Sequence, residues 1–452
     1  MTLLNELSAE VCQRARMSRD PRFDGRFFVA VKTTGIFCRP ICPANLPKEE
    51  NVEYFSSQAL AVSAGYRPCL RCRPESAPHS WAWKGAETTF LRALTLIEQG
   101  ELDGSLETLA SRLGISDRYL RQLFQRHLGM PPKQYAQIQQ LMFAKQLLHT
   151  SQISITEVAY ASGFQSTRRF NDAFQKLFRL TPTQVRRERA ALPSRNHLSL
   201  AFRGPFDWAH MLDFYRLRAI EGMELVDEQS YQRHFVLGEG TGWFKASMAQ
   251  SHLDIEFEME RLSDLRHLVA RLRRMFDLDA DLISIEAHLE QLAPGLVRRT
   301  GIRIPGVWNA WEAGVRAVLG QQVSVKAAIG QLNLLVSTLA ASEGSIRYFP
   351  TPEQVQMSDL SFLRMPERRK ETLKRLADYV RLHPMDSPMA WLSLSGIGPW
   401  TVDYAQLRGE SRSHCFLTGD LIVKKALAKF PQLTAESVAP WGSYATFHCW
   451  SH

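Results

Sequence analysis

The stretch LSGIGPWTVDYAQL, residues 394–407, decides how the largest part of this 452-residue chain is expected to fold. Its pattern predicts the end of one helix, a glycine-rich hairpin and the start of a second helix. Gly396 and Gly398 let backbone amides approach a phosphate closely at the start of the second helix, so no basic side chain is needed there. A G-x-G pattern alone is weak evidence for function, and its meaning depends on the stretches around it.

Two other stretches give the hairpin its context. Asp420 follows Gly398 by 22 residues within FLTGDLIVKKAL, residues 416–427, and AGVRAVLGQQVSV, residues 313–325, lies upstream. Together the three stretches resemble the helix-hairpin-helix superfamily of DNA glycosylases, specifically the 3-methyladenine glycosylases of the AlkA type. The resemblance runs from about residue 197 to the end of the chain. It implies excision of alkylated bases by hydrolysis of the N-glycosidic bond.

The resemblance also implies roles for single residues. Asp420 matches the catalytic carboxylate of that family. Three aromatic residues match its base pocket, and a glutamine matches a residue near that pocket; they are Trp400, Tyr404, Trp450 and Gln321.

Simpler explanations exist for the same residues. Asp420 can be an ordinary N-cap of the helix expected over residues 421–430, a role worth about 1 kcal/mol, and both roles can hold at once. Without the resemblance, core packing is the better explanation of Trp400, Tyr404 and Trp450.

The chain departs from the family pattern in two places. Gln322 stands where the family has an apolar residue that enters the DNA stack, and a polar amide there fills the gap with less benefit from desolvation. The chain stops at His452, just past Trp450, which predicts a short or poorly anchored last helix. In related bifunctional enzymes a lysine near the hairpin nicks the strand, whereas here Trp400 takes its place. We therefore expect a monofunctional enzyme, and we also consider a monovalent cation at the hairpin.

Four of the seven cysteines form two close pairs near the start of the chain. Cys38 and Cys42 lie in FCRPICPAN, and Cys69 and Cys72 lie in YRPCLRCRP. In a reducing compartment this spacing predicts a tetrahedral zinc–thiolate site rather than two disulfides. A purely structural zinc ion is the alternative.

These two segments resemble the zinc domain of Ada-type proteins, which repair methyl phosphotriesters in DNA. The resemblance implies that Cys38 accepts the methyl group irreversibly while the other three cysteines hold the metal. A zinc-bound sulfur stays deprotonated at neutral pH and so remains a nucleophile. Methylation changes the formal charge of the site from −2 to −1, so we expect it to tighten DNA binding.

The sequence repeats a helix, glycine turn and helix pattern within residues 105–129 and 154–187, with Gly114 and Gly163 in the turns. This layout predicts a duplicated helix-turn-helix whose second helices lie in the major groove of DNA. A helical protein-interaction module is the alternative. The double motif resembles transcription activators of the AraC type, which implies promoter DNA and RNA polymerase as partners. The side chains expected to reach bases or phosphates are Arg118, Arg121, Arg168 and Arg169.

The net charge of +9 is unevenly placed along the chain. Residues 1–200 hold 27 basic against 17 acidic side chains, and residues 201–452 hold 28 against 29. The basic excess expected of a nucleic-acid binder thus lies in the front part. The chain has no apolar signal segment and no run of 18 apolar residues, so we expect a cytoplasmic protein that binds no membrane. The resemblances imply double-stranded DNA as a partner, and with it a monomer that associates with the bacterial nucleoid.

The predicted fold is multidomain and mainly α, with a small zinc α/β domain and a small α+β domain. The α+β domain is expected from alternating segments that form a small antiparallel sheet, namely HLSLAF (197–202), YQRHFVL (231–237) and HLDIEFEM (252–259). The expected domains are residues 1–80 (zinc), 86–190 (double helix-turn-helix), 196–284 (α+β) and 285–452 (helix-hairpin-helix glycosylase). The alternative function is a transcription regulator whose glycosylase-like half only binds DNA.

Overall fold

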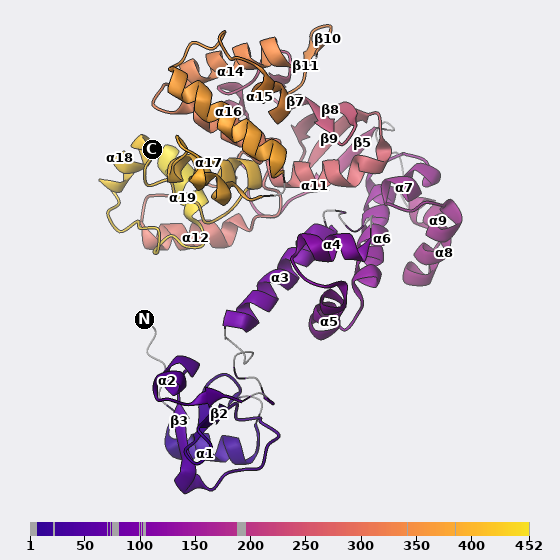
Figure 1. The fold of residues 1–452 in the computed structure, drawn as a ribbon. Coiled ribbons are helices and arrows are strands. Elements are labelled where there is room, and N and C mark those ends of the chain that lie inside the picture. Colours follow the sequence, from indigo (N-terminus) through magenta and orange to yellow (C-terminus); the bar gives the residue numbers. More distant parts are fainter. Residues whose placement is uncertain are drawn as a thin grey trace. The chain divides into compact units, whose positions relative to one another are not determined.

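The computed structural model describes residues 7–20, 23–69, 71–72, 74, 81–98, 100, 102, 105–187, 196–340, 342–384 and 386–451. The chain divides into two compact units, Met1–Gln139 and Gln140–His452. Figure 1 gives the order of the helices and strands. Among the described residues, no helix has the length and apolar character needed to cross a bilayer.

The first unit begins with a small four-stranded sheet, in the strand order β3-β1-β2-β4. Strand β1 pairs with β2 and β3 in antiparallel fashion, whereas β2 and β4 run parallel. The elements of this domain are α1 (Ala9–Met17), β1 (Phe28–Val31), β2 (Ile36–Cys38), η2 (Glu49–Asn51), β3 (Val52–Phe55), α2 (Gln58–Ser63) and β4 (Arg67–Pro68).

Helices then follow one another to residue 187. They are α3 (Trp81–Glu98), α4 (Leu106–Arg112), α5 (Asp117–Leu128), α6 (Pro132–Thr150), α7 (Ile155–Ala161), α8 (Thr167–Phe178) and α9 (Pro182–Arg187). The boundary between the two units falls within α6.

The pairs α4–α5 and α7–α8 are the two predicted helix-turn-helix motifs. Gly114 and Gly163 occupy the turns with φ of 68° and 84°, a backbone region that favours glycine. Each second helix starts at a serine N-cap, where Ser116 accepts a hydrogen bond from the Tyr119 amide and Ser166 accepts one from the Arg169 amide.

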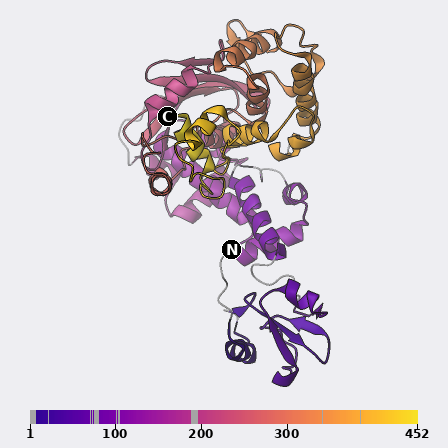
Figure 2. The ribbon, with the colours of Figure 1, turned by 90° about the vertical axis from the view of Figure 1, so that its left-hand side faces the viewer.

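The second unit also holds a five-stranded antiparallel sheet, in the order β5-β9-β8-β7-β6, which Figure 2 shows from a second direction. One face is apolar and forms a common core with α10 (Trp208–Arg216) and α11 (Leu265–Met275). The strands are β5 (His197–Ala201), β6 (Glu224–Val226), β7 (Ser230–Leu237), β8 (Gly240–Met248) and β9 (His252–Met259).

The remaining helices surround α13 (Ala310–Gly320), which is buried along almost its whole length. Its neighbour α17 (Pro399–Glu410) approaches closely because Gly409 has no side chain; a Cβ atom there would lie 2.5 Å from the Ala310 Cα. The other elements are η4 (Leu262–Asp264), α12 (Leu282–Leu292), α14 (Val325–Leu339), β10 (Ser342–Glu343), β11 (Ile346–Arg347), α15 (Pro352–Met357), α16 (Glu367–Leu382), η5 (Pro388–Ser393), α18 (Leu421–Leu427) and α19 (Gly442–Trp450).

The predicted fold class is confirmed: the described residues are mainly helical, with one small sheet beside α1 and α2, a second beside α10 and α11, and a two-stranded sheet of β10 and β11. The last helix is short, as expected, but residues 442–449 are buried, so it is well anchored. The domain boundaries stay predictions. The boundary at 80 and the linker at 191–195 lie outside the described residues, and position 284 lies inside α12.

Candidate functional site

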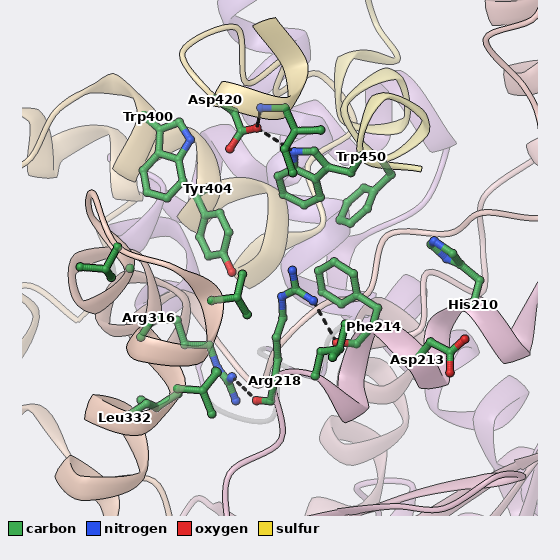
Figure 3. A pocket seen from close by; sticks show the side chains of 18 residues that line it. His210, Asp213, Phe214, Arg218, Arg316, Leu332, Trp400, Tyr404, Asp420 and Trp450 are labelled. Atoms are coloured by element: carbon green, nitrogen blue, oxygen red, sulfur yellow. Dashed lines mark hydrogen bonds between the residues drawn. The ribbon is translucent and has the colours of Figure 1, made fainter. Parts of the chain in front are cut away.

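A cavity of about 390 Å³ opens in the second unit, between α10, the start of α14, α17, α18 and α19. Figure 3 shows the side chains that line it. Four residues predicted from the sequence meet at this cavity, although they come from two helices, α17 and α19, and the loop before α18: Trp400, Tyr404, Asp420 and Trp450.

Aromatic rings form two opposite walls of the cavity. Trp400 stacks on Tyr404 with ring centroids 5.3 Å apart and planes 27° apart. Across the cavity, Trp450 is nearly parallel to Phe214, with centroids 6.2 Å apart and planes 14° apart (Figure 3). A flat group that enters the cavity can therefore contact aromatic faces on both sides.

Asp420 lies at one end of the cavity and is held by one of its two carboxylate oxygens. Its Oδ1 accepts hydrogen bonds from the amides of Ile422 (2.9 Å) and Val423 (3.2 Å) and from the indole Nε1 of Trp450 (3.1 Å). Asp420 is therefore the N-cap of α18, as the simpler explanation required. Within the described part of the chain no hydrogen bond to Oδ2 occurs, so the N-cap role leaves this oxygen available.

The opposite end of the cavity carries a cation that sequence reasoning missed. The guanidinium of Arg218 lies 3.7 Å from the ring centroid of Phe214 and donates a 3.2 Å hydrogen bond to the Phe214 carbonyl. Burial, helped by the nearby positive charges of Arg408 and Arg316, lowers the pKa of Arg218 to about 10, so the side chain stays charged at neutral pH. No sequence motif marks this residue, because Arg218 follows α10, about 200 residues before Asp420.

His210 on α10 is another lining residue without a sequence signal. Its Nε2 lies 3.4 Å from the Ser451 hydroxyl. Burial lowers the pKa of His210 below its usual value, and the carboxylates of Asp207 and Asp213 oppose the effect only in part. His210 is therefore mainly neutral at pH 7.

A buried ionic network supports the floor of the cavity. Arg316 lies between Glu312 and Glu224, with nitrogen–oxygen distances of 2.8 Å and 3.2 Å, and Arg233 pairs with both carboxylates. Arg316 also donates a 2.9 Å hydrogen bond to the carbonyl of Arg218. The network thus joins the five-stranded sheet to α13 and fixes the backbone that carries the Arg218 cation.

The glycine hairpin forms as predicted between η5 and α17. Gly396 has φ of 93°, and a Cβ atom there would lie 2.1 Å from the Thr372 hydroxyl, so only glycine fits. Gly398 is the N-cap of α17, and its Cβ position faces open space.

The two glutamines lie in the loop between α13 and α14. The side chain of Gln321 is absent from the described lining of the cavity and instead donates hydrogen bonds to the hairpin. Gln322 is exposed and has φ of 56°, a left-handed conformation that is uncommon for residues other than glycine.

In the first unit, the four predicted metal ligands converge. Their sulfur atoms all lie within 4.8 Å of one another. The parallel pairing of β2 with β4 brings the end of one strand beside the end of the other, and the Cys69 amide donates a 3.0 Å hydrogen bond to the Phe37 carbonyl. The other two ligands, Cys42 and Cys72, follow in the turns after these strands.

The donor set fits zinc. Four sulfur ligands are typical of a closed tetrahedral zinc site. The Arg39 amide donates a 3.3 Å hydrogen bond to the Cys72 sulfur, and the Arg39 side chain is held by the buried Asp24. The hydrogen bond to Cys72, together with burial, raises the pKa of the Cys38 thiol, and the same bond lowers the pKa of Cys72 to about 6. All four thiols are therefore ionised together only beside a cation. The predicted zinc site is therefore supported.

The four arginines predicted to meet DNA are exposed on the second helices of the two motifs: Arg118 and Arg121 on α5, Arg168 and Arg169 on α8. Arg121 pairs with Asp117 at 2.7 Å on the same helix. Of the three phenylalanines on α8, Phe170 and Phe174 are buried, as expected for core positions.

Comparison with known proteins covers almost the whole chain. Family models match residues 11–75 (metal binding domain of Ada), 109–188 (helix-turn-helix domain) and 197–309 (AlkA N-terminal domain). The chain is 34% identical to a probable bifunctional transcriptional activator/DNA repair enzyme AlkA of Mycobacterium tuberculosis, over 98% of this chain and 96% of that protein.

Two Escherichia coli proteins match separate halves. DNA-3-methyladenine glycosylase 2 is 33% identical over 56% of this chain and 96% of its own length. The bifunctional transcriptional activator/DNA repair enzyme Ada is 35% identical over 38% of this chain and 47% of its own length. The chain therefore belongs to the family of bifunctional transcriptional activator/DNA repair enzymes in which an Ada-like metal-binding and helix-turn-helix region is fused to an AlkA-like glycosylase.

Proposed function

We propose that residues 196–452 form a monofunctional DNA glycosylase of the 3-methyladenine type II class, and that the zinc domain transfers methyl groups from DNA phosphotriesters to Cys38. One observation carries the glycosylase proposal: Asp420 presents an oxygen without a hydrogen bond, among the described residues, at the end of a cavity with two aromatic walls.

The cavity geometry supports base excision. A base flipped out of the duplex would lie between the Trp400 and Trp450 walls. Cleavage of the N-glycosidic bond develops positive charge on the deoxyribose, and the Asp420 carboxylate would stabilise that charge electrostatically. The described lining of the cavity contains no lysine, so water rather than an amine would attack the sugar and leave an intact abasic strand.

Exposure excludes Cys42 and Cys69 as the methyl acceptor, because both are buried whereas Cys38 and Cys72 are partly exposed. The Cys72 sulfur accepts a hydrogen bond from the Arg39 amide, which makes it a weaker nucleophile and favours Cys38. Bound zinc would keep the sulfurs ionised. The Cys38 sulfur would form a bond to the methyl carbon as the bond from that carbon to the phosphate oxygen breaks. The phosphodiester anion would leave, and the site would become less negative toward DNA.

The exposed arginines of α5 and α8 support promoter binding through two successive major grooves. We also propose that the protein contacts RNA polymerase, acts as a monomer, associates with the bacterial nucleoid and holds a monovalent cation at the hairpin. The competing function is a transcription regulator whose glycosylase-like half, residues 196–452, only binds DNA, and a carboxylate oxygen left available at the end of a cavity with aromatic walls has no use in that case.

A single experiment tests both activities. Duplex DNA methylated at bases and phosphates is incubated with the wild-type protein and with Asp420→Asn, and released bases and protein-bound methyl groups are measured. We expect the wild type to release alkylated bases and to carry one methyl group on Cys38. Asp420→Asn should bind DNA and accept the methyl group, but should lose base release by about 10² or more. Undiminished base release in Asp420→Asn, or strand nicking trapped by borohydride, would refute the glycosylase mechanism. A methyl group on Cys12 or Cys415 instead of Cys38 would refute the acceptor assignment.

A further inference from the structure

The loop between α13 and α14 is tied to the glycine hairpin by one side chain. The Nε2 of Gln321 donates two hydrogen bonds, to the Gly396 carbonyl at 3.1 Å and to the Thr401 hydroxyl at 3.2 Å. Both hydrogens of the amide are used, and their acceptors lie on either side of Gly398, the N-cap of α17. Among the described residues, no other side chain of this loop forms a hydrogen bond with the hairpin.

The hairpin is itself a fixed point. Gly396 packs so closely on Thr372 that even a methyl group would collide with it, and Thr372 is only 2% exposed on α16. Thr401 is equally buried in the first turn of α17. The amide of Gln321 therefore connects the loop to a part of the molecule that cannot shift.

The loop carries residues suited to entering DNA. Gln322 is exposed with a left-handed backbone, and the next residue, Val323, is 41% exposed and lines the mouth of the cavity. Residues presented on a loop hold a defined position only when other contacts fix the backbone. On the near side, Ser324 caps α14 by accepting a hydrogen bond from the Ala327 amide. At the other end, the Gln321 amide closes α13 by donating a 3.4 Å hydrogen bond to the Val318 carbonyl, and the Gln321 side chain adds the link to the hairpin.

We propose that Gln321 is a positioning residue for base flipping. Its two hydrogen bonds hold the Gln322–Val323 loop at a set distance from the phosphate-binding hairpin. The hairpin then binds the DNA backbone while the loop fills the space left by the flipped base, and the two parts keep a fixed separation. This inference rests on the proposed glycosylase function, and it gives Gln321 a role outside the base pocket.

The test uses Gln321→Met in the full chain, because methionine keeps the side-chain length and removes both donors without adding charge. The probe is a duplex with 2-aminopurine beside an abasic site, whose fluorescence rises when stacking is lost. We expect the fluorescence change and the single-turnover rate of base release to fall roughly tenfold, with the Kd for undamaged duplex within about twofold of wild type. A structural defect would instead lower the melting temperature and all three readouts together.

Gln331→Met is the matched control. The Gln331 Oε1 accepts a 2.6 Å hydrogen bond from the Arg364 amide on the far side of α14, so the same substitution removes a similar bond away from the hairpin. It should leave the fluorescence signal unchanged. Thr401→Val removes one of the two acceptors and should have little further effect in the Gln321→Met background, because both changes break the same link.

Three results would overturn the proposal. They are a normal fluorescence signal and rate in Gln321→Met, an equal loss in Gln331→Met, and a loss of affinity for undamaged DNA as large as the loss of flipping. The fluorescence signal does not depend on bond cleavage. If the wild type released no base, the glycosylase function would fail while this test would still give an answer.

Discussion

Arg218 sets the electrostatics of the cavity. Aromatic faces attract the positive charge of N-alkylated purines by about 0.5–2 kcal/mol per contact. The guanidinium of Arg218 works against that attraction, because it stays charged and no carboxylate among the described residues pairs with it. The cavity thus combines walls that favour a cation with a floor that repels one. Arg218 does not repel a neutral base. A neutral base that carries a hydrogen-bond acceptor can also accept a hydrogen bond from the Arg218 guanidinium.

Arg218→Met should shift the choice of substrate. Methionine keeps the contact with Phe214 and removes the charge, so kcat/KM for a cationic base such as N7-methylguanine should rise about fivefold relative to a neutral purine with a carbonyl oxygen. The ratio is measured with two duplexes of identical sequence. Arg261→Met, which removes an exposed arginine paired with Glu239 on the sheet, should leave the ratio unchanged. An unchanged ratio in Arg218→Met would show that its charge does not reach the base.

The sequence predicted the cavity residues that lie in motifs. It missed the residues that only the fold brings to the cavity. Asp420, Trp400 and Tyr404 lie in recognisable stretches near the hairpin. Arg218 and His210 come from α10, and only packing of that helix against α19 brings them to the cavity. Gln321 was recognised as near the base pocket, but the direction of its amide depends on the hairpin it meets.

Among the elements, the two helix-turn-helix motifs end their second helices in different ways. Helix α5 ends at Gly129, with φ of 68°, and α8 ends at Arg179, with φ of 58°. Both positions are left-handed caps, where glycine is favoured over residues with a side chain. The second motif therefore holds a residue that strains its own helix end.

Exchange of these caps should change stability in opposite directions. Arg179→Gly should stabilise α8 by about 0.5–1 kcal/mol, and Gly129→Arg should destabilise α5 by about 1 kcal/mol. Hydrogen exchange of the amides in each helix is the measurement, because it reports local opening free energies. Slower exchange in α5 of Gly129→Arg would contradict this explanation of the helix ends. Arg179→Gln is the control for the loss of the arginine charge, and this variant should not stabilise α8.

Element prediction succeeded where periodicity was clear and failed where glycine interrupted it. Strands β5, β7 and β9 follow alternating segments, and the sequence predicted them. Strand β8 was not predicted, because GTGWFKASM has glycines at its first and third positions. Gly242 is required by the sheet itself: a Cβ atom there would lie 2.5 Å from the Glu258 carbonyl oxygen. Packing between neighbouring strands, which the sequence does not show, determines that residue.

On the scale of the second unit, one buried carboxyl connects three distant segments. Asp277 follows α11, accepts a 3.2 Å hydrogen bond from the Ile304 amide and accepts one of 3.0 Å from the Tyr444 hydroxyl on α19. Burial raises the pKa of Asp277 from 3.8 to about 7. The folded chain therefore binds this proton more tightly than the unfolded chain does.

This linkage predicts the pH dependence of stability. The stabilisation from the protonated carboxyl is fully present below the unfolded pKa of 3.8 and is lost as pH rises through the folded pKa of about 7. In Asp277→Asn no proton can be lost, so the free energy of unfolding should fall less between pH 5 and pH 8 than in the wild type. Urea denaturation at a series of pH values measures the difference. Parallel curves for the two proteins would exclude Asp277 as the source.

One aromatic wall of the cavity is built from segments that lie far apart in the sequence, Phe214 on α10 and Trp450 on α19. The metal ligands of the first unit, in contrast, all lie between Cys38 and Cys72. At a synthesis rate of about 5–20 residues per second, Phe214 leaves the ribosome on the order of 10–50 s before its stacking partner. During that interval the nascent chain already contains all four cysteine ligands and both helix-turn-helix motifs. A nascent chain is therefore equipped to detect damage and answer at a promoter before it is able to remove a base.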